Sequence, residues 1–375
     1  MHVEFNTGEM REAIRSIKKI FSKGPVGEEA KEDVDTKDCI VASKADGFII
    51  EAARSGLYCR SKIKASVESE GSFVISRGSL CDVKWDHETT VFKLDEKENR
   101  ILFRSGTFDG NIPVSQAVEV ILNQKPSGIP KVTLTLPCKV LQEGIKRISF
   151  TPTIQRGLLD FNLKIIVKGK TLVMTTNDSY RAAAFKAELE DAVPEATIVT
   201  TRPFFASVVS SIPSDEKVGI GLSDKGLRIK GGTLDVFQPA LQELELLDIP
   251  ARIKTLLETK AEVRCKIDAK KSRDSIIRAS SVVPAQFGEI RLVLKFNVKK
   301  GIAVPQVDSS RGGGQDPFEA QDIELKDSDE VVVSSKYISE CLSLLDGEVE
   351  MLVWDRTVML RSESLNTTLI LPQLT

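Results

Sequence analysis

The sequence predicts an α+β fold made of three similar domains, and three observations support that prediction. A strand that runs into an amphipathic helix occurs three times, beginning at Val3, Val132 and Val263, roughly 130 residues apart. A later strand in each copy runs into a helix that begins with a basic residue. The rest of each copy alternates short apolar segments with turn residues. Two helices segregated to one side of antiparallel sheets make an α+β domain.

The first motif of each copy changes from a strand pattern to a helix pattern. The three segments read VEFNTGEMREAIRSIKKIF, VTLTLPCKVLQEGIKRISF and VRCKIDAKKSRDSIIRASSVV. Each opens with the alternation of a strand and continues with the spacing of a helix. In the first copy we expect a helix over residues 8–21, with Met10, Ile14, Ile17 and Phe21 in one apolar stripe.

The second motif places a hydroxyl residue and a basic residue between a strand and a helix. Its three copies read VISRGSLCDV, VTTRPFFASVV and VSSKYISECLSLL. The basic residues are Arg77, Arg202 and Lys336. A hydroxyl before the first turn can accept hydrogen bonds from the free backbone amides of the helix. The predicted N-caps are therefore Ser76, Thr201 and Ser335.

Glycine and aspartate pairs predict tight hairpin turns between the remaining strands. We expect turns at 46–47, 168–169, 224–226 and 355–356. The segment 305–322 contains three consecutive glycines among polar residues, which predicts a mobile surface excursion from the third copy.

Segments rich in proline, glycine and charge separate the copies. The predicted domains are 1–127, 131–250 and 260–375, each with two helices and antiparallel strands.

Motifs of catalysis and of metal binding are missing from the sequence. His2 and His87 are the two histidines, and the six cysteines are scattered without a CxxC pair. The segment Gly169–Thr171 resembles the end of a phosphate-binding loop, but Lys164 stands where that loop needs a glycine. We therefore expect no enzyme, no cofactor and no metal site. An enzyme that uses Asp, Arg and Lys without a local signature remains an alternative.

The expected location follows from the same inspection. The N-terminus lacks the pattern of a secretory signal, and no apolar run reaches the length of a membrane span. We expect an intracellular protein with reduced thiols and no membrane partner.

Basic residues gather on the first helix of each copy, although the net charge of the chain is −2. At helical spacing they fall away from the apolar side in the first two copies and are more widely spread in the third. The candidate DNA-binding residues are Arg11, Arg15, Lys18, Lys19, Lys139, Lys146, Arg147, Lys270, Lys271, Arg273 and Arg278.

A positive face on a slightly acidic protein suits loose contact with phosphates. Such contact is independent of base sequence and permits movement along the nucleic acid. Aromatic residues make up only 6% of the chain, and no run of them offers a stacking platform for single strands. Duplex DNA is therefore the expected partner. A scaffold that binds only proteins would keep the repeat but would have no use for the basic helices.

Short segments outside the repeat resemble a known family. Residues 176–182 read TNDSYRA, which is similar to an Ala-Thr-Asp-Gly-x-Arg-Leu segment but has Ser179 and Ala182 in place of the glycine and the leucine. Pro250 precedes a basic stretch and Leu256, and the chain ends TLILPQLT. With the three α+β copies, these segments resemble the beta sliding clamps of bacterial DNA polymerase III and their phage relatives over the whole chain.

The resemblance implies a fold, a function and a set of partners. In that family two subunits close head to tail into a ring of six similar domains that encircles duplex DNA. The chain would be a cytoplasmic processivity factor, in a bacterium or a phage-infected cell, that tethers the replicative DNA polymerase. The polymerase and the clamp loader would dock through short peptides in a pocket lined by Arg181, Pro250, Leu256, Leu369, Leu371 and Pro372.

Ring closure requires contact between the first and third copies of neighbouring subunits, because their ends are unmatched within one chain. We expect one side of this contact at Val282 and Val283, after the first helix of the third copy. The other side is expected at the second helix of the first copy, near Leu80 and Trp85.

Overall fold

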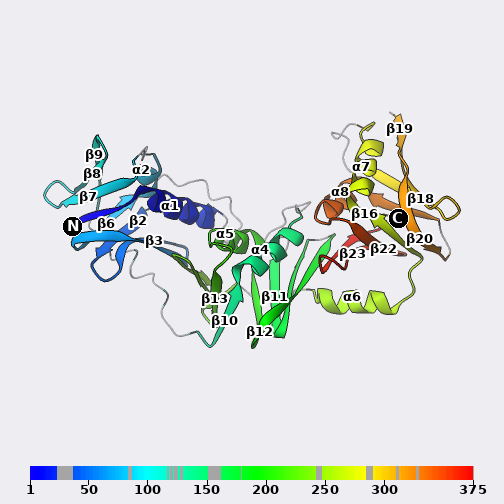
Figure 1. The fold of residues 1–375 in the computed structure, drawn as a ribbon, viewed down its shortest axis with the longest axis horizontal. Coiled ribbons are helices and arrows are strands. Elements are labelled where there is room, and N and C mark those ends of the chain that lie inside the picture. The colour runs from blue at the N-terminus through cyan, green and yellow to red at the C-terminus, as the bar shows by residue number, and fades with distance from the viewer. Residues whose placement is uncertain are drawn as a thin grey trace. The chain divides into compact units, whose positions relative to one another are not determined.

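The computed structural model describes residues 1–22, 37–82, 87–115, 118, 121, 126, 130–150, 162–178, 180–241, 247–283, 290–309, 312–326 and 329–374 (Figure 1). Over these residues antiparallel strands and short helices form a mixed α+β structure, which confirms the predicted fold class. The chain divides into two compact units, Met1–Gln142 with Pro203–Glu243, and Glu143–Arg202 with Leu244–Thr375. The boundaries expected near 127, 131, 250 and 260 stay a prediction.

The first unit contains a five-stranded and an eight-stranded antiparallel sheet. In sheet order, the smaller one is β5 (Ala65–Ser69), β1 (His2–Asn6), β7 (Thr89–Asp95), β8 (Arg100–Ser105) and β9 (Phe108–Pro113). The larger one is β10 (Val132–Pro137), β13 (Lys217–Ser223), β14 (Gly226–Gly231), β15 (Leu234–Pro239), β4 (Leu57–Ile63), β3 (Gly47–Arg54), β2 (Lys37–Ser43) and β6 (Gly71–Ser76). Helix α1 (Thr7–Ser22) packs against β3 and β4 through its apolar side.

The second unit is built on one eleven-stranded sheet. Its order is β11 (Asn162–Asn177), β12 (Ala182–Thr201), β24 (Thr367–Pro372), β23 (Thr357–Ser362), β22 (Glu348–Trp354), β16 (Val263–Asp268), β20 (Phe318–Leu325), β18 (Ile302–Ser309), β17 (Arg291–Asn297) and β21 (Glu330–Ser334). Strand β19 (Gly312–Gln315) pairs with β18. Helices α7 (Ala269–Ser280) and α8 (Ser335–Ser343) pack against each other.

Both repeated motifs form the elements that were predicted. Each copy of the first motif is a strand followed at once by a helix: β1 with α1, β10 with α4 (Cys138–Arg147), and β16 with α7. Each copy of the second motif is again such a pair: β6 with α2 (Arg77–Asp82), β12 with α5 (Arg202–Val209), and β21 with α8. The N-caps agree less well. Ser334 caps α8 instead of Ser335, and the Thr201 hydroxyl makes no hydrogen bond.

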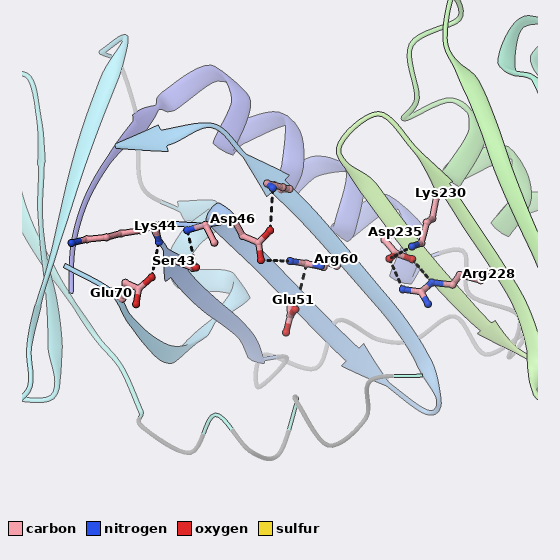
Figure 2. A network of polar contacts seen from close by, with 11 residues as sticks. Ser43, Lys44, Asp46, Glu51, Arg60, Glu70, Arg228, Lys230 and Asp235 are labelled. Atoms are coloured by element: carbon pink, nitrogen blue, oxygen red, sulfur yellow. Dashed lines mark hydrogen bonds and ion pairs between the residues drawn. The ribbon is translucent and has the colours of Figure 1, made fainter. Parts of the chain in front are cut away.

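Strands from the middle of the chain complete the sheets of both units. In the first unit β15 pairs with β4, and in the second unit β12 pairs with β24. Directly opposed residues of alternating charge cross the β4–β15 seam on one face of the sheet: Glu51, Arg60, Asp235 and Lys230 (Figure 2). Opposite charges in direct register stabilise strand pairing, so this row favours the observed alignment of β4 with β15.

Two predicted irregular segments belong to strands. No hairpin turn forms at 168–169, because β11 continues through Gly169, which has a φ of +60° and marks a register shift against β12. The other predicted turns lie where expected, between β2 and β3, β13 and β14, and β22 and β23. In place of an irregular excursion at 305–322, the described residues form β18, β19 and β20.

Gly314 in the glycine-rich segment lies too close to α7 to carry a side chain. A methyl group at Gly314 would overlap the backbone carbonyl of Ala279 in α7 and would touch the side chain of Val282. The absence of a side chain therefore lets β19 lie directly against the end of α7.

Candidate nucleic-acid interface and partner surfaces

Helix α1 separates an apolar side from a basic side, as the sequence predicts. Met10, Ala13, Ile14, Ile17 and Ile20 are buried against the sheet. On the other side Arg15, Lys18 and Lys19 are exposed, and Arg11 is partly exposed. The Nζ of Lys19 donates a hydrogen bond to the Ser210 hydroxyl at 2.7 Å, so the basic side of α1 reaches the residue that follows α5.

Helix α4 keeps two of its three predicted basic residues on the surface. Lys139 and Lys146 are exposed. Arg147 is only 8% exposed, and its guanidinium bonds to Glu143 at 2.6 Å, Asp346 at 3.2 Å and the Leu344 carbonyl at 3.1 Å. The donors of Arg147 therefore already have acceptors in the protein, and its contact with DNA stays a prediction.

Acidic neighbours surround the basic residues of α7. Arg278 lies 2.6 Å from Asp316, Arg273 lies 3.0 Å from Asp274, and Lys271 lies 3.7 Å from Glu319. Lys270 is exposed. These pairs lower the positive potential of α7, so this helix offers less attraction for phosphate than its sequence suggests.

Arg181 is buried within the second unit, and its expected place in a peptide pocket stays a prediction. Its side chain is 0% exposed, and its guanidinium pairs with Asp178 at 3.0 Å and with Glu340. The rings of Phe150 and Tyr337 lie 4.5 and 4.6 Å from the guanidinium carbon. Burial opposes the charge, but the hydrogen bond to Glu340 and the charge of Asp178 leave the pKa of Arg181 raised. The residue thus holds the start of β12 against α8.

The predicted C-terminal pocket residues Leu369 and Leu371 share one face of β24, and their place in a pocket stays a prediction. Leu369 and Leu371 are fully buried, whereas Ile370 between them belongs to a second cluster with Ala182, Met359 and Ile249. Ile253 and Leu256 pack on that cluster from α6 (Ile249–Glu258), and Pro250 lies in the first turn of this helix. Pro372, at the end of β24, is half-buried. Successive strand residues point to opposite faces, which places Ile370 on the face of β24 against which α6 packs.

Helix α6 occupies the linker for which no helix was predicted. Asp248 caps it by accepting a hydrogen bond from the Ala251 amide at 3.1 Å, and Pro250 follows in the first turn. Asp before a helix-compatible proline is a helix start signal, and Ile249, Ile253 and Leu256 have helical spacing. These signals could have located the helix.

The predicted ring contact is placed only in part. Val282 is 42% exposed, and Val283 is half-buried. Leu80 is 1% exposed, so its side chain is buried within its own unit, and its expected role in the ring contact stays a prediction. Trp85 lies outside the described residues.

Two exposed apolar side chains flank the β9 edge of the first unit, on opposite faces of the sheet. Phe108 on β9 is 51% exposed, and Leu102 on the neighbouring β8 is 40% exposed. Among the described strands β9 is an outer strand of its five-stranded sheet, so its backbone edge can accept a further strand. Phe108, a phenylalanine between Thr107 and Asp109, was the signal that the sequence offered.

The described residues contain no group of three or more His, Cys, Asp or Glu side chains that could hold a metal ion. The five cysteines within the described side chains are buried and form no disulfide. Burial raises the pKa of Cys265 and of Cys341 to about 12, so both thiols stay protonated and unreactive. Within the same residues no helix is both long and apolar enough to cross a membrane.

No protein-family model and no curated protein matches the chain by sequence. Solved structures match it over its full length. A putative DNA polymerase III beta subunit from Eubacterium rectale is 15% identical, with a TM-score of 0.84 over 100% of both chains. The DNA polymerase sliding clamp of Bacillus subtilis is 17% identical, and the DNA polymerase III beta subunit of Thermotoga maritima is 16% identical. Their TM-scores are 0.82 and 0.80, over 100% of this chain and 99% of each of theirs. The chain therefore has the fold of these structures from end to end.

Proposed function

We propose that the chain is a DNA sliding clamp, a non-catalytic processivity factor that encircles duplex DNA and tethers a replicative DNA polymerase. The observation that carries the proposal is the full-length fold match to DNA polymerase III beta subunits, combined with exposed lysines on α1 and α4. A cytoplasmic site of action, in a bacterium or a phage-infected cell, follows from this role.

The exposed basic residues of α1 and α4 would supply the contact with DNA. Lys18, Lys19, Lys139 and Lys146 extend from helices whose other side is anchored in the core. Lysine carries its charge on a long, flexible stem, which suits nonspecific contact with successive phosphates. Arg147 is left out of this set because its ion pairs hold it in the protein.

Assembly into a ring of two subunits is part of the proposal. We infer that the outer edge of β9, with Phe108 and Leu102, meets the surface around Val282 of a second copy. Strand addition at an open edge gives backbone hydrogen bonds, and the exposed apolar side chains add area that is buried on contact.

Partner peptides would dock near the second cluster, where α6 lies on β12 and β24. The accessible apolar residues there are Ile253 and Leu256, which are only partly buried. Arg181 would act indirectly, because its bonds to Asp178 and Glu340 fix the chain that leads into β12. The clamp loader and the polymerase are the expected sources of such peptides.

Topology distinguishes a ring from a protein that merely adheres to DNA. Protein reassembled from monomers in the presence of a nicked circular plasmid should coelute with the circle at a salt concentration that prevents ordinary binding. Cutting the circle once should release it, because a ring slides off a free end. A protein scaffold without a DNA role would be retained by neither form. Equal retention on circular and linear DNA would contradict encirclement.

A further inference from the structure

The second unit contains a pocket that borders the second cluster through Leu352 and Trp354 but includes neither Ile253 nor Leu256. Its volume is about 810 Å³, and it lies beside the C-terminal end of α6, over strands β16, β20, β22 and β23. Cavities of roughly 300–1,000 Å³ accommodate small ligands or a few side chains of a peptide. The pocket is therefore large enough to be a binding site in its own right.

One wall of the pocket is apolar and open to solvent. Leu257 of α6 is 45% exposed, and Trp354 of β22 is partly exposed while its Nε1 donates to the Thr259 carbonyl at 3.3 Å. Leu352, on the same face of β22, contributes a buried surface behind them. The hydrogen bond fixes the indole against the end of α6, so the apolar wall is preformed. Tryptophan in such a setting is a frequent anchor point for protein partners.

The opposite wall is charged, and its cations retain donor capacity. The carboxylate of Glu350 is only 15% exposed and accepts a hydrogen bond from Arg264 at 2.9 Å, with Arg361 at 3.8 Å. Arg361 also lies 3.3 Å from Glu363. A guanidinium has five N–H donors, so these carboxylates occupy a minority of the donors of the two arginines. Two lysines, Lys260 and Lys326, also line the pocket. An incoming carboxylate therefore finds donors close to the apolar wall.

We propose that this pocket binds a short peptide segment of a partner protein in which an apolar side chain stands next to a carboxylate. The apolar side chain would lie between Leu257 and Trp354, and the carboxylate would accept hydrogen bonds from Arg264 and Arg361. A nucleic-acid strand fits less well, because the carboxylates of Glu258, Glu324 and Glu350 in the same lining would repel a continuous row of phosphates. The inference goes beyond the proposed function, since it requires neither DNA nor a ring.

The test uses the emission of Trp354 as a local reporter. Changing the other tryptophan in a Trp85→Phe variant leaves Trp354 as the sole indole. The full-length protein is titrated with the probe acetyl-Asp-Leu-Leu-Glu-amide. Matched probes are acetyl-Lys-Leu-Leu-Lys-amide, which reverses the charge, and acetyl-Asp-Gly-Gly-Glu-amide, which removes the apolar groups. We expect a saturable change with the first probe and about tenfold weaker binding of the other two. Calorimetry on the unaltered protein gives the same comparison if the Trp85→Phe variant fails to fold.

Paired variants assign the binding to the pocket. Leu257→Ser and Arg361→Ala should each weaken the first probe about tenfold. Their controls are Leu247→Ser, at a leucine 53% exposed, and Arg356→Ala, at an arginine in the exposed β22–β23 turn. Both controls should bind as the unaltered protein does. Absence of saturable binding, equal binding of the basic probe, or a stronger response to an oligo-dT strand than to the acidic peptide would each overturn the proposal. A failed plasmid experiment would leave these results unchanged.

Discussion

The guanidinium of Arg202 lies over the ring of Phe150, with 5.2 Å between its carbon and the ring centroid. Arg77 lies over Phe21 in the same way, at 4.7 Å. Phe21 and Phe150 hold equal positions in two copies of the first motif, and Arg77 and Arg202 hold equal positions in the second motif. The cation over the ring therefore joins the two repeated motifs of a copy. In the third copy Ser281 stands at the ring position.

Replacing the ring should destabilise the first unit. A Phe21→Leu variant keeps an apolar side chain below Arg77 but removes the π face, which should cost about 1–2 kcal/mol of unfolding free energy. Urea unfolding at neutral pH measures this change. Val298→Ala, at a valine that is 53% exposed, is the control and should differ little from the unaltered protein. Equal effects of the two changes would argue against the contact.

The buried pair of Arg77 and Asp38 should show a dependence on pH. The two side chains meet at 2.6 Å, and Asp38 is 1% exposed. Burial raises the pKa of Asp38, and the hydrogen bond and charge of Arg77 partly lower it. In Arg77→Met the lowering cause is removed, so the pKa of Asp38 rises further. Breaking a buried pair on one side typically costs about 3–5 kcal/mol.

The sign of this effect follows from proton linkage. An acid whose pKa is higher in the folded state binds its proton more tightly there, so folding is favoured as pH falls. The Arg77→Met variant should therefore lose most stability above the folded pKa of Asp38 and recover part of it toward acid pH. Urea unfolding at several pH values tests this, and Asp38→Asn in the same variant should restore stability at neutral pH. A pH-independent loss would show that the uncompensated carboxylate is not its cause.

Removing four exposed lysines should weaken DNA binding without unfolding the protein. The variant carries alanine at Lys18, Lys19, Lys139 and Lys146. Every phosphate that is no longer neutralised by a lysine should reduce the salt dependence of binding by roughly 0.9 in the log–log slope. Fluorescence anisotropy with duplex DNA at several salt concentrations measures this slope.

A charge-matched control separates placement from total charge. It carries alanine at Lys97, Lys168, Lys254 and Arg356, which are exposed residues outside the three basic helices. Its slope should stay near that of the unaltered protein. Identical slopes for the two variants would mean that only net charge matters.

Gly314 should not tolerate a side chain. In Gly314→Ala the new methyl group meets the carbonyl of Ala279, and a strand or a helix has to shift. Overpacking of this kind costs about 1–3 kcal/mol. Gly219→Ala is the control, because its nearest neighbour would lie 3.7 Å away in ordinary contact. Thermal unfolding of both variants gives the comparison, and equal melting temperatures would refute the steric explanation.

Self-association should depend on the β9 edge. Phe108→Asp places a charge on the apolar surface that we assign to the ring contact, so the dimer should dissociate at protein concentrations where the unaltered chain is dimeric. Sedimentation velocity measures the distribution. Val298→Asp changes another exposed apolar residue, 53% exposed, and should leave the distribution unchanged. An unaltered dimer in Phe108→Asp would exclude this edge.

Sequence periodicity predicted the structural features that are set by residues close together in the chain. The strand–helix pairs, the apolar side of α1 and three of the four hairpin turns follow from spacing within short segments. The hairpin turn predicted at Gly169 was wrong because a glycine with positive φ can occupy a bulge as well as a turn. Only the pairing of β11 with β12 distinguishes the two.

The surroundings of several predicted site residues depend on partners far away in the sequence. Arg147 looks solvent-facing on a helical wheel, but Asp346 lies almost two hundred positions later. Arg181 is buried by Phe150, Tyr337 and Glu340, none of which is near it in sequence. An apolar residue such as Leu80 suits a core position and a subunit contact equally well. Its burial in the folded chain depends on tertiary packing, which the sequence pattern does not show.

Because β15 pairs with β4 and β12 pairs with β24, the sequence repeat is not the piece into which this chain can be cut. A fragment ending near residue 127 would lack β15, so β4 would have an unpaired backbone edge. Arg60 on that edge would no longer lie opposite Asp235. A fragment beginning near 260 would lack β12 and α6 and would uncover Ile370, Leu352 and Met359. Unpaired strand edges with apolar flanks invite aggregation. Because the three copies share sheets in this way, deletion of any one copy would expose strand edges in the copies that remain. Their solubility would fall as a result.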